Sequence, residues 1–214
     1  MTPRLDVPVL HGSRVRLEPL AMRHAPDLAR AAEEERSSYG FTTVPRAAGM
    51  EEHLRVQLGL DGLTPFAQIR VRDDMAVGCT AFWNPRPWPG RAELYAIEIG
   101  WTWLAATAQG TGINAEAKLL LFTHAFETLG VARVDLKTDA RNQRSLRAIE
   151  RLGARFEGVL RNASPSWAPG ETGRLRDSAM FSVIAAEWPA VKAALTARLT
   201  ASPPADDPHP VDTR

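Results

Sequence analysis

Residues 98–126 read EIGWTWLAATAQGTGINAEAKLLLFTHAF, which predicts an apolar strand, a turn with two glycines and then a helix. The expected strand covers residues 92–104. The expected helix covers residues 115–129, because its apolar side chains recur at i, i+3 and i+4. Gly110 and Gly112 lie in the turn, where the missing side chains let the backbone approach a ligand closely. Residues 113–117 are expected to supply the unpaired N–H groups of the helix's first turn, which together with the helix dipole favour a phosphate or pyrophosphate.

The same turn also has a purely structural interpretation, in which its glycines only permit a tight bend between strand and helix. Two nucleotide-binding motifs do not match it. A P-loop needs Lys and then Ser or Thr directly after its last glycine, whereas Ile113 and Asn114 follow Gly112. A dinucleotide fingerprint needs three spaced glycines, and this turn has only Gly110 and Gly112.

The rest of the chain supplies further strands and helices that do not alternate strictly. Strands are expected at residues 14–20, 66–71, 76–83, 133–138, 155–160 and 174–184, and helices at 21–35, 49–60, 143–152 and 188–199. Residues 1–13, 84–90 and 162–174 are expected to be irregular or looped. This pattern favours a mixed α/β fold with a twisted, mostly antiparallel central sheet flanked by helices. We expect a single domain over residues 1–200 and a disordered tail over 201–214, which is rich in Pro and Asp.

The composition is that of an ordinary globular protein, with 44% hydrophobic and 24% charged residues. A formal net charge of +1 gives no broad basic surface, which argues against nucleic-acid binding. No apolar run approaches the roughly 20 residues of a membrane-spanning helix, and residues 1–20 lack the pattern of a signal peptide. The single cysteine, Cys79, excludes an intrachain disulfide and favours a reducing compartment. We therefore expect a cytoplasmic protein, without a metal site because the histidines show no ligand spacing.

A second motif lies in residues 137–158, KTDARNQRSLRAIERLGARFEG, where Asn142 and Ser145 stand at the start of a short helix. Taken singly, Asn142 is explained as an N-cap and Ser145 as a first-turn residue. The order of the two segments, a glycine turn followed by N-x-x-S, is the more specific signal.

With both motifs the chain resembles the GNAT acyltransferases, and most closely their RimJ/RimL-type N-acetyltransferases, from residue 14 to residue 184. In that superfamily a Q/R-x-x-G-x-G/A turn binds the pyrophosphate of coenzyme A. The matching residues here are Gln109, Gly110, Thr111, Gly112, Ile113 and Asn114, with Asn114 standing where the family has Gly or Ala. The resemblance further implies that Asn142 holds the pantetheine arm and that Ser145 protonates or hydrogen-bonds the departing sulfur. A backbone N–H near Trp103 or Leu104 would polarise the thioester carbonyl.

Acetyl transfer to an amine requires that an ammonium loses its proton, so a carboxylate or a water relay is expected nearby. Glu98 lies in the middle of the apolar strand, where burial can raise the pKa of its carboxyl group. Strand alternation places Glu98 on one face with Gly100 and Thr102, opposite Trp103. A structural ion pair with an arginine is the competing interpretation of Glu98. Cys79 is interpreted as a buried inert thiol rather than an acyl-carrying nucleophile.

The sequence thus predicts an acetyl-CoA-dependent N-acetyltransferase that acts by direct attack of a primary amine. The acceptor could be a protein N-terminus or a small-molecule amine, and the resemblance is compatible with a homodimer. Two alternatives remain open: a non-catalytic acyl-CoA-binding module, and a nucleotide-binding domain that uses the glycine turn.

Overall fold

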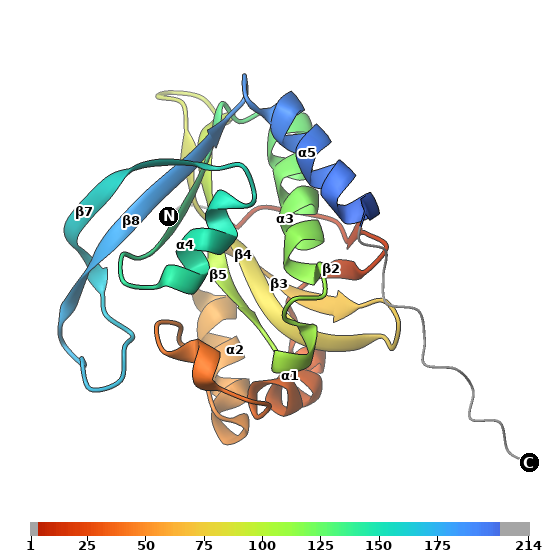
Figure 1. Cartoon of the computed structure of the whole chain (residues 1–214), viewed down its shortest axis with the longest axis vertical. Coiled ribbons are helices and arrows are strands. Elements are labelled where there is room, and N and C mark those ends of the chain that lie inside the picture. The colour runs from red at the N-terminus through yellow and green to blue at the C-terminus, as the bar shows by residue number, and fades with distance from the viewer. Residues whose placement is uncertain (1–3, 202–214) are drawn as a thin grey trace, which may run out of the picture.

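The computed structural model describes residues 4–201, which form one eight-stranded sheet in the order β1-β2-β3-β4-β5-β6-β8-β7 (Figure 1). Every neighbouring pair is antiparallel except β5 and β6, which run parallel. The mixed, mostly antiparallel α/β fold is therefore confirmed. The strands are β1 (Leu10–His11), β2 (Val15–Pro19), β3 (Leu63–Arg70), β4 (Met75–Pro87), β5 (Leu94–Leu104), β6 (Arg133–Asp139), β7 (Arg155–Pro165) and β8 (Leu175–Ile184).

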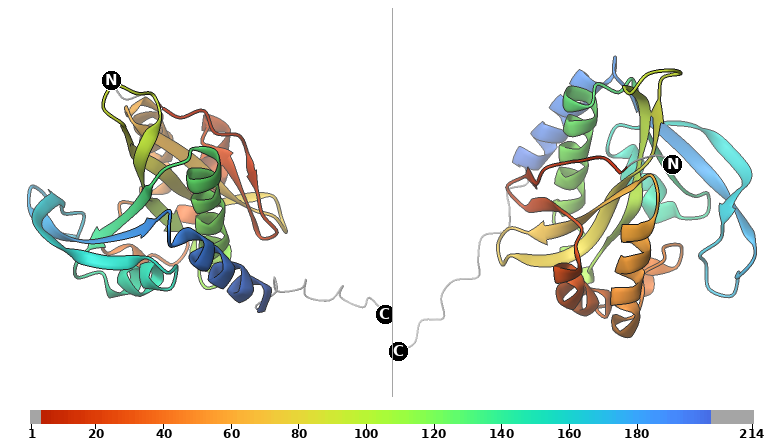
Figure 2. Two further views of the ribbon diagram at one scale, coloured as in Figure 1. Left: turned by 90° about the horizontal axis from the view of Figure 1, so that it is seen from above. Right: turned by 180° about the vertical axis from the view of Figure 1, so that it is seen from behind.

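Helices cover both faces of the sheet (Figures 1 and 2). On one face lie α3 (Ile113–Thr123), α4 (Gln143–Glu150) and α5 (Trp188–Ala201), and on the other lie α1 (Ala25–Ala32) and α2 (Met50–Gly59). The helix α3 buries Ile113, Ala117 and Leu121, which recur every four residues and so share one side of the helix. Short 3-10 turns complete the chain: η1 (Met22–His24), η2 (Ser37–Tyr39), η3 (Ala47–Gly49) and η4 (Ala106–Ala108).

Several boundaries differ from the sequence-based expectation. The proline-rich residues 84–90 were expected to form a loop, but β4 continues to Pro87. Prolines are tolerated there because β3 pairs with β4 only as far as Trp83, so among residues 4–201 no strand pairs with the remainder of β4 on that side. In the same way β7 continues to Pro165.

Three smaller differences lie at element ends. The expected irregular lead-in contains the short strand β1. The long helix ends in a π-helical turn, η5 (His124–Thr128), and is closed by Gly130 with a φ of 66°. Ala201, expected to begin the tail, is instead the last residue of α5, and residues 202–214 lie outside the described part.

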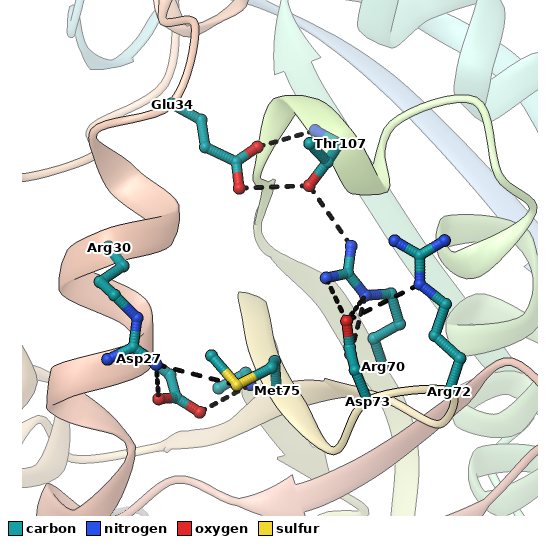
Figure 3. A network of polar contacts seen from close by, with 9 residues as sticks. Asp27, Arg30, Glu34, Arg70, Arg72, Asp73, Met75 and Thr107 are labelled. Atoms are coloured by element: carbon teal, nitrogen blue, oxygen red, sulfur yellow. Dashed lines mark hydrogen bonds and ion pairs between the residues drawn. The ribbon is translucent and has the colours of Figure 1, made fainter. Parts of the chain in front are cut away.

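A network of polar side chains joins α1 to the β3–β4 hairpin and to the turn that follows β5 (Figure 3). Asp27 accepts a hydrogen bond from the backbone N of Ala76 at 3.1 Å and from Arg30 at 2.6 Å. Glu34 accepts bonds from the backbone N and the hydroxyl of Thr107 at 2.8 and 3.1 Å. Because Thr107 lies in η4, this network fixes the start of the segment that leads into the glycine turn.

Candidate active site

The glycine turn has the backbone shape that an anion site requires. Gly110 has a φ of 79° and Gly112 a φ of 87°, both in the left-handed region that favours glycine. Gly112 is the N-cap of α3 and has no side chain with which to cap it, so the first N–H groups of α3 lack a side-chain partner at that position. A Cβ atom added to Gly110 would meet nothing within 4 Å, so the turn is open on this side. These features fit a bound diphosphate.

Side chains around the turn hold it against the neighbouring elements. The Gln109 amide donates to the backbone oxygen of Leu104 at 2.8 Å, and its oxygen accepts a bond from Arg144 of α4 at 2.5 Å. The hydroxyl of Thr111 donates to Ala108 at 2.7 Å. The side-chain oxygen of Asn114 is buried and has no hydrogen-bond partner within residues 4–201. Gln109 is therefore tied to protein groups, which leaves the backbone of the turn to face a ligand.

The strands β5 and β6 separate beside this turn. They pair only at Ala96, Ile97 and Glu98, opposite Arg133, Val134 and Asp135. Beyond that point β5 stays paired with β4, and β6 stays paired with β8. Within the described residues, the edge of β5 that faces β6 therefore has no partner strand from residue 99 to its end, which leaves backbone groups available to an extended ligand.

The two backbone donors expected near the end of β5 point in opposite directions. The N–H of Ala105 donates to Val77 at 2.8 Å, on the β4 side. Successive N–H groups of an extended strand alternate between its two edges. The N–H of Trp103 therefore points toward β4, as that of Ala105 does, and the N–H of Leu104 points toward the gap between β5 and β6. The backbone oxygen of Leu104 accepts bonds from Tyr39 at 2.9 Å and from Gln109. Of the two predicted residues, Leu104 and not Trp103 has its donor on the open side.

A β-bulge in β5 changes which side chains share a face. Gly100 lies opposite Ala81 and Trp103 lies opposite Cys79, so the two residues 101 and 102 of β5 lie opposite the single residue 80 of β4. Trp101 is the extra residue of the bulge, and its φ is 54°. Trp103 therefore lies on the face of Glu98, and Thr102 lies on the opposite one. The expectation that Thr102 accompanies Glu98 and Trp103 opposes it is wrong, because simple alternation assumes a regular strand.

The bulge is held from the α3 side by a buried lysine. Lys118 donates to the hydroxyls of Thr80 at 2.8 Å and Thr102 at 2.6 Å, and only 4% of its surface is exposed. Burial lowers the pKa of the Lys118 ammonium to about 7. Nothing in the sequence pattern marked this residue, because a lysine in a helix is ordinarily read as a surface residue.

Glu98 is buried at 7% exposure and has an ion pair with Lys137 of β6 at 3.0 Å. Burial raises the pKa of the Glu98 carboxyl, and the charge of Lys137 opposes this without cancelling it. A Cβ atom on Gly100 would lie 3.3 Å from a carboxylate oxygen of Glu98, so the absence of a side chain at Gly100 keeps that oxygen uncrowded. The structural interpretation of Glu98 expected an arginine partner, and the partner is a lysine.

Asn142 and Ser145 take the positions expected of a helix start. Asn142 is the N-cap of α4, and its side-chain oxygen accepts a bond from the backbone N of Ser145 at 3.1 Å. The N-cap interpretation of Asn142 is therefore correct, and the sulfur and pantetheine roles of the pair stay predictions. Ser145 is partly exposed, so its hydroxyl can reach a ligand.

Arg141, next to this helix, connects three segments around the face that carries Glu98. It bonds Asp139 of β6 at 2.8 Å and Glu171 of the β7–β8 loop at 2.8 Å. Its guanidinium lies 5.2 Å from the ring centroid of Phe41, in the segment between α1 and α2. Sequence reasoning missed this link because the three partners are far apart along the chain.

Other candidates have structural explanations. Cys79 is buried, and burial raises the pKa of its thiol to about 12, which agrees with an inert side chain. Trp88 packs on Tyr95 at 5.3 Å and anchors the loop, whereas Trp83 packs edge-on to the exposed Trp101 at 5.9 Å beside Glu98. Within residues 4–201, no three His, Cys, Asp or Glu side chains converge on a metal site. In the same range no helix has the length and apolar composition needed to cross a bilayer.

Comparison with known proteins gives consistent matches. The model of the acetyltransferase (GNAT) domain matches residues 14–155. The uncharacterized N-acetyltransferase p20 of Bacillus licheniformis is 30% identical over 149 residues, which are 69% of this chain and 77% of that protein. A GCN5-related N-acetyltransferase from Brucella melitensis has a TM-score of 0.81 at 30% identity, covering 96% of this chain and 95% of that one. RimJ of Mycobacterium smegmatis, solved in complex with CoA-disulfide, shares the fold with a TM-score of 0.71 at 21% identity, covering 92% and 97%.

Proposed function

The chain belongs to the GNAT acetyltransferase family, and from this premise we propose that it moves an acetyl group from acetyl-CoA to a primary amine by direct attack. The observation that carries the proposal is the gap between β5 and β6 beside a helix whose N-cap is a glycine. An extended thiol-bearing ligand with a diphosphate matches that arrangement, since the gap offers backbone groups and the helix start offers unpaired donors.

The residues that would hold the cosubstrate follow from the geometry. The backbone of residues 110–114 would bind the diphosphate, and Asn142 would lie along the pantetheine arm. Bound acetyl-CoA supplies an activated acyl group as a thioester. The N–H of Leu104 would hydrogen-bond the thioester oxygen, where a preorganised donor stabilises developing negative charge by several kcal/mol.

Two side chains would accept and donate the protons that acetyl transfer moves. Glu98 would accept the proton of the acceptor ammonium, because its raised pKa brings it closer to that of an amine than an exposed carboxylate would be. Ser145 would donate a hydrogen bond or a proton to the departing sulfur. The half-buried Trp83 and the exposed Trp101 beside Glu98 support an approach of the acceptor from this face of the sheet.

The experiment is to incubate the protein with acetyl-CoA and a panel of amines, including small amines and N-terminal peptides, while free thiol is measured. We expect thiol release that depends on the amine, and an acetylated product of matching mass. Tight binding of acetyl-CoA without thiol release for any amine would favour a non-catalytic acyl-CoA-binding module. Stronger protection against heat unfolding by ATP than by coenzyme A would favour a nucleotide-binding domain.

The oligomeric state and the compartment belong to the same proposal. We propose a cytoplasmic protein that can form a homodimer, as the family resemblance implies. Sedimentation equilibrium tests the dimer, and a single monomeric species over the whole concentration range would reject it.

A further inference from the structure

The face of the sheet that carries Glu98 continues across β6 onto β8. Glu98 lies beside Asp135 of β6, and Asp135 lies beside Ser182 of β8. The register between β6 and β8 runs without a shift from Ile184 to Ser178. Since alternate residues of a strand share a face, Arg176 follows Ser182 onto the face of Glu98. Arg176 thus lies on the side of the sheet from which the acceptor would approach.

Arg176 is a half-buried guanidinium without a binding partner. Within residues 4–201 it makes neither a hydrogen bond nor an ion pair, and its Nε atom is fully shielded from solvent. Its two terminal nitrogens are not among the shielded atoms, so they remain accessible. Buried polar groups of native proteins are nearly always satisfied, and an unsatisfied one calls for an explanation.

The carboxylates around Arg176 are already engaged by other cations. Asp139 is bound by Arg141 at 2.8 Å, and Glu98 is bound by Lys137 at 3.0 Å. Burial lowers the pKa of Arg176, and the charges of Asp139 and Glu98 oppose that effect. Both carboxylates therefore act on Arg176 from a distance without forming a contact.

We propose that Arg176 binds a carboxylate of the acceptor, so that the acceptor is an amine with a carboxylate close to its amino group. This inference rests on the proposed function. A guanidinium presents paired donors that match the two oxygens of a carboxylate. With the carboxylate on Arg176, the neighbouring amine lies on the same face as Glu98, which would take its proton. A free amino acid and an acidic residue at a peptide N-terminus share this chemistry.

The test uses pairs of acceptors that differ only in the carboxylate. Phenylalanine against phenylalaninamide represents the free amino acid, and amidated peptides that begin with Asp or Asn represent the peptide. The kcat/KM is measured for each acceptor with the wild type, Arg176→Gln and Arg176→Lys. The exposed Arg174 of the same hairpin provides the matched control, Arg174→Gln.

We expect Arg176→Gln to lower kcat/KM for the carboxylate member of one pair by about tenfold to a hundredfold, and to leave the amide member unchanged. Arg176→Lys should retain part of the preference, and Arg174→Gln should retain all of it. The pair that responds identifies the source of the carboxylate. Comparing each variant with the wild type cancels differences in amine basicity between acceptors.

If Arg176→Gln lowers kcat/KM equally for both members of each pair, or lowers it for neither, the role of Arg176 is overturned. Release of free thiol in the same assays would still support acetyl transfer. Absence of thiol release with every amine would overturn the proposed function, and this inference with it. If Arg176→Gln does not fold, the loss of preference is read from Arg176→Lys, and a ratio of kcat/KM values between the two members that is the same in Arg176→Lys and in the wild type overturns the inference.

Discussion

Glu98 and Lys118 are the two residues whose chemistry depends most on burial. Glu98 is a carboxylate on the face where an acceptor would lie, and burial raises its pKa. Lys118 is an ammonium on the opposite face, and burial lowers its pKa to about 7. In both cases desolvation disfavours the charged form.

If Glu98 is the base, Glu98→Gln should lower kcat by about a hundredfold to ten-thousandfold, because the amide cannot accept the proton. The affinity for acetyl-CoA should not change. In the wild type, kcat should rise with pH through a pKa above the ordinary value of glutamate. Lys137→Met should move that limb to still higher pH, since it removes the cation that opposes the raised pKa.

Steady-state rates across pH and binding titrations check this prediction. A kcat in Glu98→Gln equal to that of the wild type, with only a lower free energy of unfolding, would identify the ion pair with Lys137 as structural.

The lowered pKa of Lys118 predicts that the free energy of unfolding depends on pH above neutrality. Between pH 7 and 10.5 the unfolded chain binds a proton at Lys118 that the folded chain does not, so the free energy of unfolding should rise with pH in this window. Lys118→Met should remove that contribution, and Thr80 and Thr102 keep each other as partners at 2.9 Å. Urea unfolding at several pH values measures the slopes. Identical slopes in variant and wild type would mean that Lys118 is charged in the folded state.

At the level of elements, the glycine turn and α3 form the unit on which the site depends. The segment that leads into the turn is fixed by the hydrogen bond from Thr107 of η4 to Glu34. The side chain of Gln109 connects the turn to β5 and α4 by hydrogen bonds. On its other side α3 is held by α5, where the ring of Trp188 packs against that of Phe122 at 5.8 Å.

Gly110 allows a matched test of the turn. Asn and Asp tolerate the left-handed conformation better than other residues, and the space beside Gly110 is open. Gly110→Asp should raise the KM for acetyl-CoA at least about tenfold over Gly110→Asn, because two like charges about 4 Å apart repel by several kcal/mol even in a polarisable surrounding. Equal KM values for the two variants would place the diphosphate elsewhere.

The contact of α5 with α3 and with the π-helical turn η5 should contribute strongly to stability. Trp188 is 5% exposed, and its indole donates to Glu127 at 2.8 Å. Trp188→Ala should lower the free energy of unfolding by about 3–5 kcal/mol through lost burial and a cavity. Trp167 is 51% exposed, so Trp167→Ala should change it by less than about 0.5 kcal/mol. Urea denaturation compares the two, and similar losses would contradict the packing seen here.

For the whole molecule the formal net charge is only +1, but some of its carboxylates stabilise the fold only while they are ionised. Burial opposes the charge of Glu18, but hydrogen bonds from Arg23, Arg16 and His24 outweigh it and lower the pKa of Glu18 to about 2. Arg133 and Ser182 lower the pKa of Glu157 to about 2. Carboxylates with lowered pKa values stabilise the fold above the unfolded pKa and lose that effect as pH falls.

We therefore expect the free energy of unfolding to decline as the pH falls from about 5 to about 2. Added salt should weaken the decline, since these ion pairs lie near the surface and are screened. Urea midpoints at pH 7, 5 and 3, with and without salt, measure both effects. Constant midpoints between pH 5 and pH 3 would show that these ion pairs do not stabilise the folded state.

The sequence alone determined most of the elements, because periodicity and glycine conformation act over a few residues. The strand, turn and helix of residues 98–126 form in the expected order, Gly110 and Gly112 adopt positive φ, and Asn142 caps its helix. These features are encoded locally, so a single chain suffices to predict them.

Only the tertiary structure decided how the side chains of the site meet. The bulge at Trp101 moved Thr102 and Trp103 to the faces opposite those expected, because the partner strand and not the local sequence sets the register. Glu98 forms an ion pair with Lys137, and the Arg176 guanidinium has no partner in the part of the chain that the structure describes, since contacts between separate strands depend on packing across the whole sheet.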